Sequence, residues 1–202
     1  MNHLVEYSQR NLNKLMHIYI NLLFRLFLTF NATSLILVVY LVKSQKVLNG
    51  LFPFISNMPH FVSYTIYFAI PVFLTFLSLL LSRKLIDESI ETENGVSAIT
   101  EIEQANNAYL PSYLGYFFVA LSVPYCDTLI FVFAILFLFT FFSQTLYFNP
   151  LFLIFGYHFY YLTTATNIKI FLITRKELKD PRKLNFPKLK RINDFTFIDR
   201  EK

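Results

Sequence analysis

The stretch FVSYTIYFAIPVFLTFLSLLL, from Phe61 to Leu81, decides the expected fold because it contains no charged residue. A transmembrane α-helix needs about 20 consecutive apolar residues, and this stretch meets that requirement. Inside lipid the backbone must satisfy its own hydrogen bonds, which a helix does within one segment. The stretch is therefore expected to span a membrane as a helix.

Three further stretches are long and apolar enough to do the same. The first of them contains one charged residue, Arg25, the second contains Asp127, and the third contains Lys169. The sequence therefore predicts an all-α integral membrane protein with four transmembrane helices, over residues 18–42, 61–81, 113–142 and 146–174. Residues 1–174 would form the membrane domain, with a helical cytoplasmic loop at 82–111, and residues 175–202 would form a basic cytoplasmic tail.

The third stretch is longer than a single span requires. Thirty residues of helix would measure about 45 Å, and Pro124 lies inside the stretch. One interpretation is a tilted helix that bends at Pro124. The other is an interfacial segment from Tyr113 to Val123, followed by a span that begins at Cys126.

The overall composition agrees with a membrane protein. Of 202 residues, 55% are apolar and 15% are charged; Phe occurs 25 times and Gly 4 times. The mean hydropathy is +0.47. These values exclude a disordered chain, a collagen-like repeat and a disulfide scaffold, and they argue against a soluble enzyme.

The distribution of Lys and Arg predicts the orientation. Two precede the first span, two follow the second, and the tail contains ten, whereas the loop after the first span contains only Lys43 and Lys46. Because cytoplasmic segments are enriched in Lys and Arg, both termini are expected to face the cytoplasm.

The two cytoplasmic segments carry opposite charges. The loop at 82–111 holds six acidic residues, and the tail has ten basic and five acidic residues. For the acidic loop, two interpretations remain open: a solvated surface, or a docking surface for a basic protein partner or for the basic tail. The tail could contact anionic lipid, could simply reflect the orientation, or could dock a partner. The tail segment 194–199 alternates like a strand and could add to a partner's sheet edge. The docking candidates are Asp87, Glu88, Glu91, Glu101, Glu103, Lys188, Lys190, Arg191, Phe195 and Phe197. Direct binding of nucleic acid is not expected, because no reading motif is present.

Polar residues inside the expected spans are candidate functional groups. Arg25 and Asp127 lie at similar expected depths and could form an ion pair, although Arg25 could instead extend to the interface. In the fourth span, a polar patch is expected to support helix packing or contacts between copies of the chain. Its members are His158, Thr163, Thr164, Thr166 and Asn167.

No catalytic motif is found. The four His residues and the single Cys126 have no metal-ligand spacing, and no phosphate-binding or nucleophile motif occurs. We therefore expect neither an enzyme nor a bound cofactor or metal.

The layout, together with the run GYHFYYLTTATNIKIFLITRKE from Gly156 to Glu177, resembles the KwaA family, the four-span membrane subunits of the Kiwa anti-phage system. The resemblance implies a homo-oligomer, a tetramer, in the bacterial inner membrane, coupled to KwaB, a soluble cytoplasmic DNA-binding partner. It implies a subunit that senses envelope disturbance and anchors that effector. The alternatives are an immunity protein against a pore-forming colicin and a small channel or transporter subunit. Deletion of the tail would separate them, because immunity should survive it and partner coupling should not.

Overall fold

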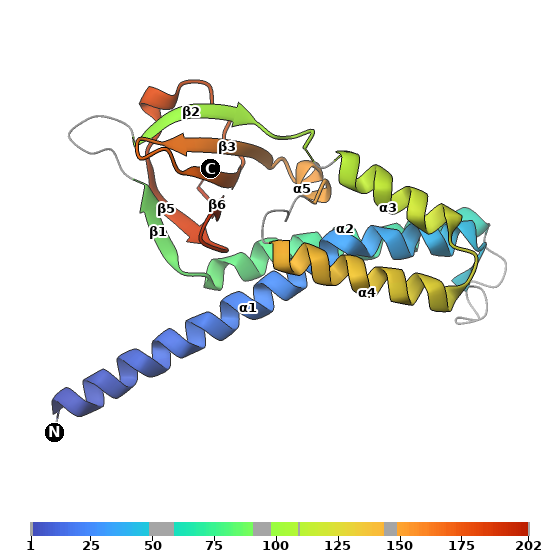
Figure 1. Cartoon of the computed structure of the whole chain (residues 1–202), viewed down its shortest axis with the longest axis horizontal. Coiled ribbons are helices and arrows are strands. Elements are labelled where there is room, and N and C mark those ends of the chain that lie inside the picture. Colours follow the sequence, from blue (N-terminus) through green and yellow to red (C-terminus); the bar gives the residue numbers. More distant parts are fainter. Residues whose placement is uncertain (1, 49–58, 91–97, 109, 144–148, 202) are drawn as a thin grey trace. The chain divides into compact units, whose positions relative to one another are not determined.

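The computed structural model describes residues 2–48, 59–90, 98–108, 110–143 and 149–201 (Figure 1). It is a mixed α/β protein with a six-stranded sheet, so the prediction of an all-α fold is wrong. The chain forms two compact units. The sheet unit comprises Met1–Phe27, Ser78–Asn106 and Gly156–Lys202, and the helical unit comprises Leu28–Leu77 and Asn107–Phe155.

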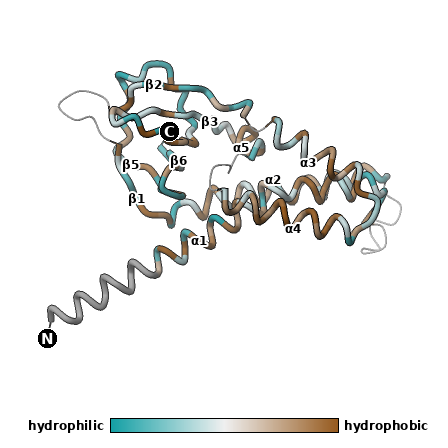
Figure 2. Tube along the Cα trace, viewed as in Figure 1, coloured by the Kyte–Doolittle hydropathy of each residue, from teal (hydrophilic) through white to brown (hydrophobic). Residues whose placement is uncertain are grey.

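Four helices carry most of the apolar sequence (Figure 2). They are α1 (Asn2–Lys43), α2 (His60–Leu81), α3 (Leu110–Ser122) and α4 (Cys126–Ser143); a single turn, α5 (Leu151–Ile154), follows. Among the described residues, three segments are long and apolar enough to cross a membrane: Met16–Lys43, His60–Lys84 and Cys126–Ser143. These candidate spans match the first two predicted spans and the second half of the third.

The third predicted span is two helices rather than one. α3 ends at Ser122 and α4 begins at Cys126, so the break falls at Pro124, as expected for a residue that cannot continue a helix. The hydroxyl groups of Tyr116 and Thr140 lie 3.2 Å apart. Because Tyr116 precedes the break and Thr140 follows it, α3 and α4 lie side by side and run in opposite directions as a helical hairpin (Figure 1).

The sheet contains strands from distant parts of the sequence. The strands are β1 (Asp87–Ile90), β2 (Ile99–Gln104), β3 (His158–Thr164), β4 (Lys169–Thr174), β5 (Phe186–Arg191) and β6 (Thr196–Asp199). Their order is β1-β5-β6-β4-β3-β2, and every pair is antiparallel except β4 with β6. In the part of the chain that the structure describes, Ser82–Lys84 and Pro181–Lys183 form short 3₁₀ helices.

The fourth predicted span is wrong: most of it is the β3–β4 hairpin. Five consecutive residues of β4, from Ile170 to Thr174, are buried. A strand that is covered on both faces reads as a continuous apolar run, and hydropathy alone does not separate such a run from a helix. The apolar character of this segment therefore reflects burial within the sheet unit.

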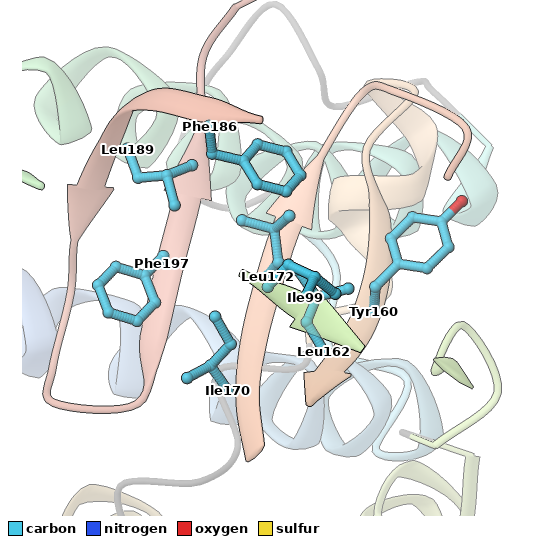
Figure 3. Close-up of a cluster of buried hydrophobic side chains, with 8 residues drawn as sticks. All are labelled: Ile99, Tyr160, Leu162, Ile170, Leu172, Phe186, Leu189 and Phe197. Atoms are coloured by element: carbon cyan, nitrogen blue, oxygen red, sulfur yellow. The ribbon is translucent and has the colours of Figure 1, made fainter. Parts of the chain in front are cut away.

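The core of the sheet unit packs against one face of the curved sheet (Figure 3). Leu162 from β3, Leu172 from β4 and Leu189 from β5 are fully buried there. The rest of the cluster is Ile99, Tyr160, Ile170, Phe186 and Phe197. Strands β2, β3, β4, β5 and β6 all contribute, so this core holds together residues 99–104 and residues 158–199.

Two predictions for the cytoplasmic segments are also wrong. The loop at 82–111 contains strands β1 and β2, where short helices were expected. The alternating segment at 194–199 is a strand, as its pattern suggested, but β6 lies between β4 and β5 of its own chain. Its two edges are thus already paired, and it cannot add to a partner's sheet.

Candidate functional surfaces

The acidic loop and the basic tail neutralise each other along the pairing of β1 with β5. Lys190 Nζ lies 2.8 Å from Asp87 Oδ1, and Arg191 Nη1 lies 3.2 Å from Glu88 Oε2. Lys190 also donates to the carbonyl of Leu85 at 2.9 Å. Hydrogen bonding to Asp194 and the field of Glu88 raise the pKa of Arg191. Four of the predicted docking residues therefore have partners within the chain.

A second acid–base pair lies on β2 and β4. Lys169 Nζ lies 2.7 Å from Glu103 Oε2 and 4.5 Å from the centroid of the Tyr161 ring. The hydrogen bond to Glu103 raises the pKa of Lys169, whereas burial raises the pKa of Tyr161. Glu101 accepts a hydrogen bond from Thr163 Oγ1 at 3.3 Å. Of the remaining acidic candidates, Glu91 lies outside the described residues.

The two aromatic docking candidates have different environments. Phe197 is only 6% exposed and belongs to the core, whereas Phe195 is 58% exposed on the turn between β5 and β6. The backbone N–H of Phe195 donates to Asn193 Oδ1 at 2.8 Å, and its carbonyl accepts from the N–H of Phe171 at 2.7 Å. These hydrogen bonds hold the backbone that presents the exposed ring of Phe195. Lys188 is also exposed, and both residues remain candidates for docking.

The predicted helix-packing patch forms the β3–β4 turn. Asn167 has φ 59°, a left-handed conformation that Asn tolerates better than most residues. Thr164 Oγ1 lies 2.9 Å from Thr166 Oγ1 and accepts from the N–H of Ile168 at 3.1 Å. Thr163 is the neighbouring residue of β3. These polar side chains therefore organise a turn, and the prediction that they pack helices is wrong.

His158 lies at the start of β3, beside the end of β2. Asn106 Oδ1 accepts from the N–H of Phe159 at 2.8 Å, and Asn106 Nδ2 lies 3.1 Å from His158 Nδ1. Because the amide oxygen is already engaged, the amide nitrogen donates to Nδ1, and a neutral His158 carries its proton on Nε2. His158 also borders a groove of about 440 Å³ with Gln104, Tyr160, Glu177 and Lys179, which the sequence did not predict. The pairing of β2 with β3 brings Gln104 beside Tyr160, and the segment after β4 contributes Glu177 and Lys179.

In the helical unit, buried polar groups join α1 to α2. Asn31 in α1 and Thr75 in α2 are fully buried, and their side chains are 2.8 Å apart. In the orientation that satisfies the amide, the oxygen of Asn31 accepts from Asn149 Nδ2 at 2.9 Å, and its nitrogen donates to the Pro71 carbonyl at 3.1 Å. Tyr113 of α3 donates to the carbonyl of Ala32 in α1 at 2.8 Å. These polar residues contribute interhelical hydrogen bonds in an apolar setting.

Arg25 and Asp127 lie in different units. Arg25 is a half-buried residue of α1, and Asp127 is an exposed residue in the first turn of α4. A carboxylate at a helix N-terminus is stabilised by the helix dipole without a cationic partner. The ion pair between them stays a prediction. Within the described part of the chain, no group of three or more His, Cys, Asp or Glu residues could hold a metal.

These observations define the class of protein. It is an α/β protein with a six-stranded sheet and, in its described residues, three candidate membrane spans. A family model described as anti-phage protein KwaA matches residues 24–198. The chain therefore belongs to the KwaA family of anti-phage proteins, which confirms the resemblance seen in its sequence. No curated protein and no solved structure matches the chain.

Proposed function

We propose that this protein is the inner-membrane subunit of an anti-phage defence complex. The helical unit senses disturbance of the envelope, and the sheet unit anchors a soluble cytoplasmic effector. Membership of an anti-phage family and three candidate spans support this function. The Kiwa resemblance further suggests a homotetramer that binds the DNA-binding partner KwaB.

The observation that carries the proposal is the origin of the strands. β2 ends just before α3, β3 begins just after α5, and Gln104 of β2 pairs with Tyr160 of β3. Two paired strands must lie on one side of a bilayer, because a β-sheet with open edges is not tolerated in hydrocarbon. The segment between them must therefore leave and return on the same side. The α3–α4 hairpin meets this requirement when the shorter apolar helix α3 crosses the bilayer together with α4, as a fourth crossing beside the three candidate spans. The pair α1 and α2 likewise leaves one side of the bilayer and returns to it before β1.

The charge distribution supports a cytoplasmic location for this side. All ten Lys and Arg of residues 175–202 belong to the sheet side, as do Arg83 and Lys84. The connections on the opposite side contain only Lys43 and Lys46. By the positive-inside rule, the sheet unit and both ends of the chain face the cytoplasm.

The exposed ring of Phe195 is our candidate anchor for the effector. Aromatic side chains that are held rigidly and exposed often dominate protein–protein binding energies. Phe195 lies at the turn between two strands, and its backbone is fixed by hydrogen bonds. The acidic and basic side chains of β1 and β5 pair with each other, so they supply less free charge for a partner.

Sensing requires a helix packing with two states that membrane strain can bias. The buried hydrogen bonds of Asn31 with Thr75 and of Tyr113 with the Ala32 carbonyl hold one such packing. A change in lateral pressure or thickness would favour a packing in which these bonds are exchanged. The connections between helices and strands would carry that change to the sheet unit.

Cysteine labelling tests the topology on which the proposal depends. Cys126, the only cysteine, is exposed at the start of α4. A membrane-impermeant maleimide should label Cys126 in intact spheroplasts, whereas the C126S/K188C variant should be labelled only after lysis. The reverse pattern would contradict a cytoplasmic sheet unit. A detergent pull-down of tagged protein expressed with its neighbouring genes should then recover a stoichiometric soluble partner, and its absence would contradict the anchoring role.

A further inference from the structure

Three arginines gather at the end of α2. Arg200 Nη1 donates to Ser82 Oγ at 2.7 Å and to the carbonyl of Leu79, which belongs to the last turn of the helix. Arg83 follows Ser82 directly in the 3₁₀ turn Ser82–Lys84. The guanidinium of Arg200 is thus held beside the backbone that carries Arg83.

The register of the sheet brings Arg175 to the same place. β4 and β6 are parallel, with Ile173 opposite Ile198, and each strand ends one residue later. Arg175 and Arg200 follow the two strands in matching positions, and parallel neighbours lie about 4.8 Å apart. The guanidinium of Arg175 also lies 4.7 Å from the centroid of the Tyr157 ring. Burial lowers the pKa of Arg200, and the charges of Arg83 and Arg175 lower it further.

The nearby carboxylates are engaged elsewhere. Asp199 and Glu201 lie 3.2 Å and 3.4 Å from Lys176 Nζ, and Asp199 also accepts from Thr174 Oγ1 at 3.0 Å. Side chains alternate between the faces of a strand, so these groups point away from their arginine neighbours. Among the ion pairs of the described residues, none includes one of the three arginines. Within the described residues, the three cations therefore converge and none of them has an ion-paired carboxylate.

The position along α2 indicates which anion is available. Arg83 lies at the end of the candidate span His60–Lys84, at the level where lipid headgroups meet water. An apolar groove of about 310 Å³ reaches the same turn. One side of the groove is lined by Leu23, Phe24 and Phe27 of α1, and the other side by Leu81 and Lys84. A groove of this kind suits an acyl chain, and a pair of guanidinium groups suits a phosphate.

We propose that Arg83 and Arg175 bind the phosphate of an anionic phospholipid at the cytoplasmic end of α2, with Arg200 fixing the turn that presents Arg83. This proposal rests on the proposed function, because it requires the sheet unit to face the anionic inner leaflet. Arg200 is a positioning residue: its hydrogen bonds to Leu79 and Ser82 define where Arg83 lies. A lipid bound by both arginines would connect the end of α2 with the end of strand β4. The content of anionic lipid in the membrane would then affect how firmly the sheet is held at this point.

The test is a native mass-spectrometry titration of the full chain in detergent with phosphatidylglycerol, phosphatidylcholine or inorganic phosphate. We expect the wild type to retain phosphatidylglycerol in preference to phosphatidylcholine. The R83Q/R175Q variant should bind it more weakly by about tenfold per arginine, since a charged hydrogen bond contributes that much. The R83K/R175K variant should lie between the two, because lysine keeps the charge and loses the fork.

The matched control is R182Q/K183Q, which removes two exposed charges from the turn Pro181–Lys183. It should retain phosphatidylglycerol like the wild type. Equal losses in the control and in R83Q/R175Q would overturn the proposal in favour of a general charge effect. So would retention of inorganic phosphate as strong as that of the lipid, or no preference for the anionic lipid. The lipid titration does not involve the effector. A negative titration would therefore contradict the lipid site alone, whereas the pull-down and the cysteine labelling test the proposed function.

Discussion

At the scale of single residues, Phe195 and Phe197 separate docking from folding. Phe197→Ala should lower the free energy of unfolding by about 3–5 kcal/mol, because it opens a cavity in the core. Phe195→Ala should change it by less than about 0.5 kcal/mol, since the ring is exposed, but should weaken capture of the soluble partner by about 2 kcal/mol. Thermal unfolding and a quantitative pull-down measure the two effects. If the Phe195→Ala variant captured the soluble partner as well as the wild type does, Phe195 would not be the anchor.

Asn31 allows a residue-scale test of the helical unit. Asn31→Leu should destabilise the protein by about 1 kcal/mol, because the hydrogen bonds with Thr75 and Asn149 are lost in an apolar setting. Thr65→Ala is the matched control: the exposed Thr65 hydroxyl bonds only within α2, to the Phe61 carbonyl. Its cost should stay below about 0.5 kcal/mol. Unfolding in mixed micelles, followed by circular dichroism, compares the two variants, and equal costs would argue against an interhelical role.

At the scale of elements, substitutions in the β3–β4 turn test whether the segment at 158–174 is a strand hairpin or a membrane helix. Asn167→Val should destabilise the protein by about 1–2 kcal/mol, because a β-branched residue is strained at φ 59°. Asn167→Gly should be nearly neutral there, since glycine adopts this conformation freely. In a membrane helix the order would reverse, with glycine the more disruptive substitution. Thermal stabilities of the two variants in detergent decide between the turn and the helix.

The β3–β4 hairpin shows why the sequence predicts the helices α1 and α2 correctly but does not predict the strands β3 and β4. A helix in lipid and a strand covered on both faces impose the same apolar composition, so the run from Ile170 to Ile173 carries no signal that separates them. The Thr and Asn residues at 163–167 are a turn signal, but the same residue types also occur where membrane helices pack, so they do not separate the two structures. Charge pairs such as Asp87 with Lys190 join residues about a hundred positions apart, and the local sequence does not encode which acid meets which base.

At the scale of the whole molecule, the sheet depends on two sequence segments that the α3–α4 hairpin separates. Ala105 donates to the carbonyl of Phe159, so the ends of β2 and β3 lie as close as in a hairpin with a tight turn. A chain of residues 82–202 in which 107–156 is replaced by Asn-Gly should therefore fold without detergent, because the cluster around Leu162 and Leu172 lies wholly within the sheet unit. Far-UV circular dichroism should show β-structure with little helix, and gel filtration should give a soluble species. Phe197→Ala in this shortened chain should abolish folding, and Phe195→Ala should not. A helical or insoluble product with both Phe residues intact would show that the sheet does not fold without the rest of the chain.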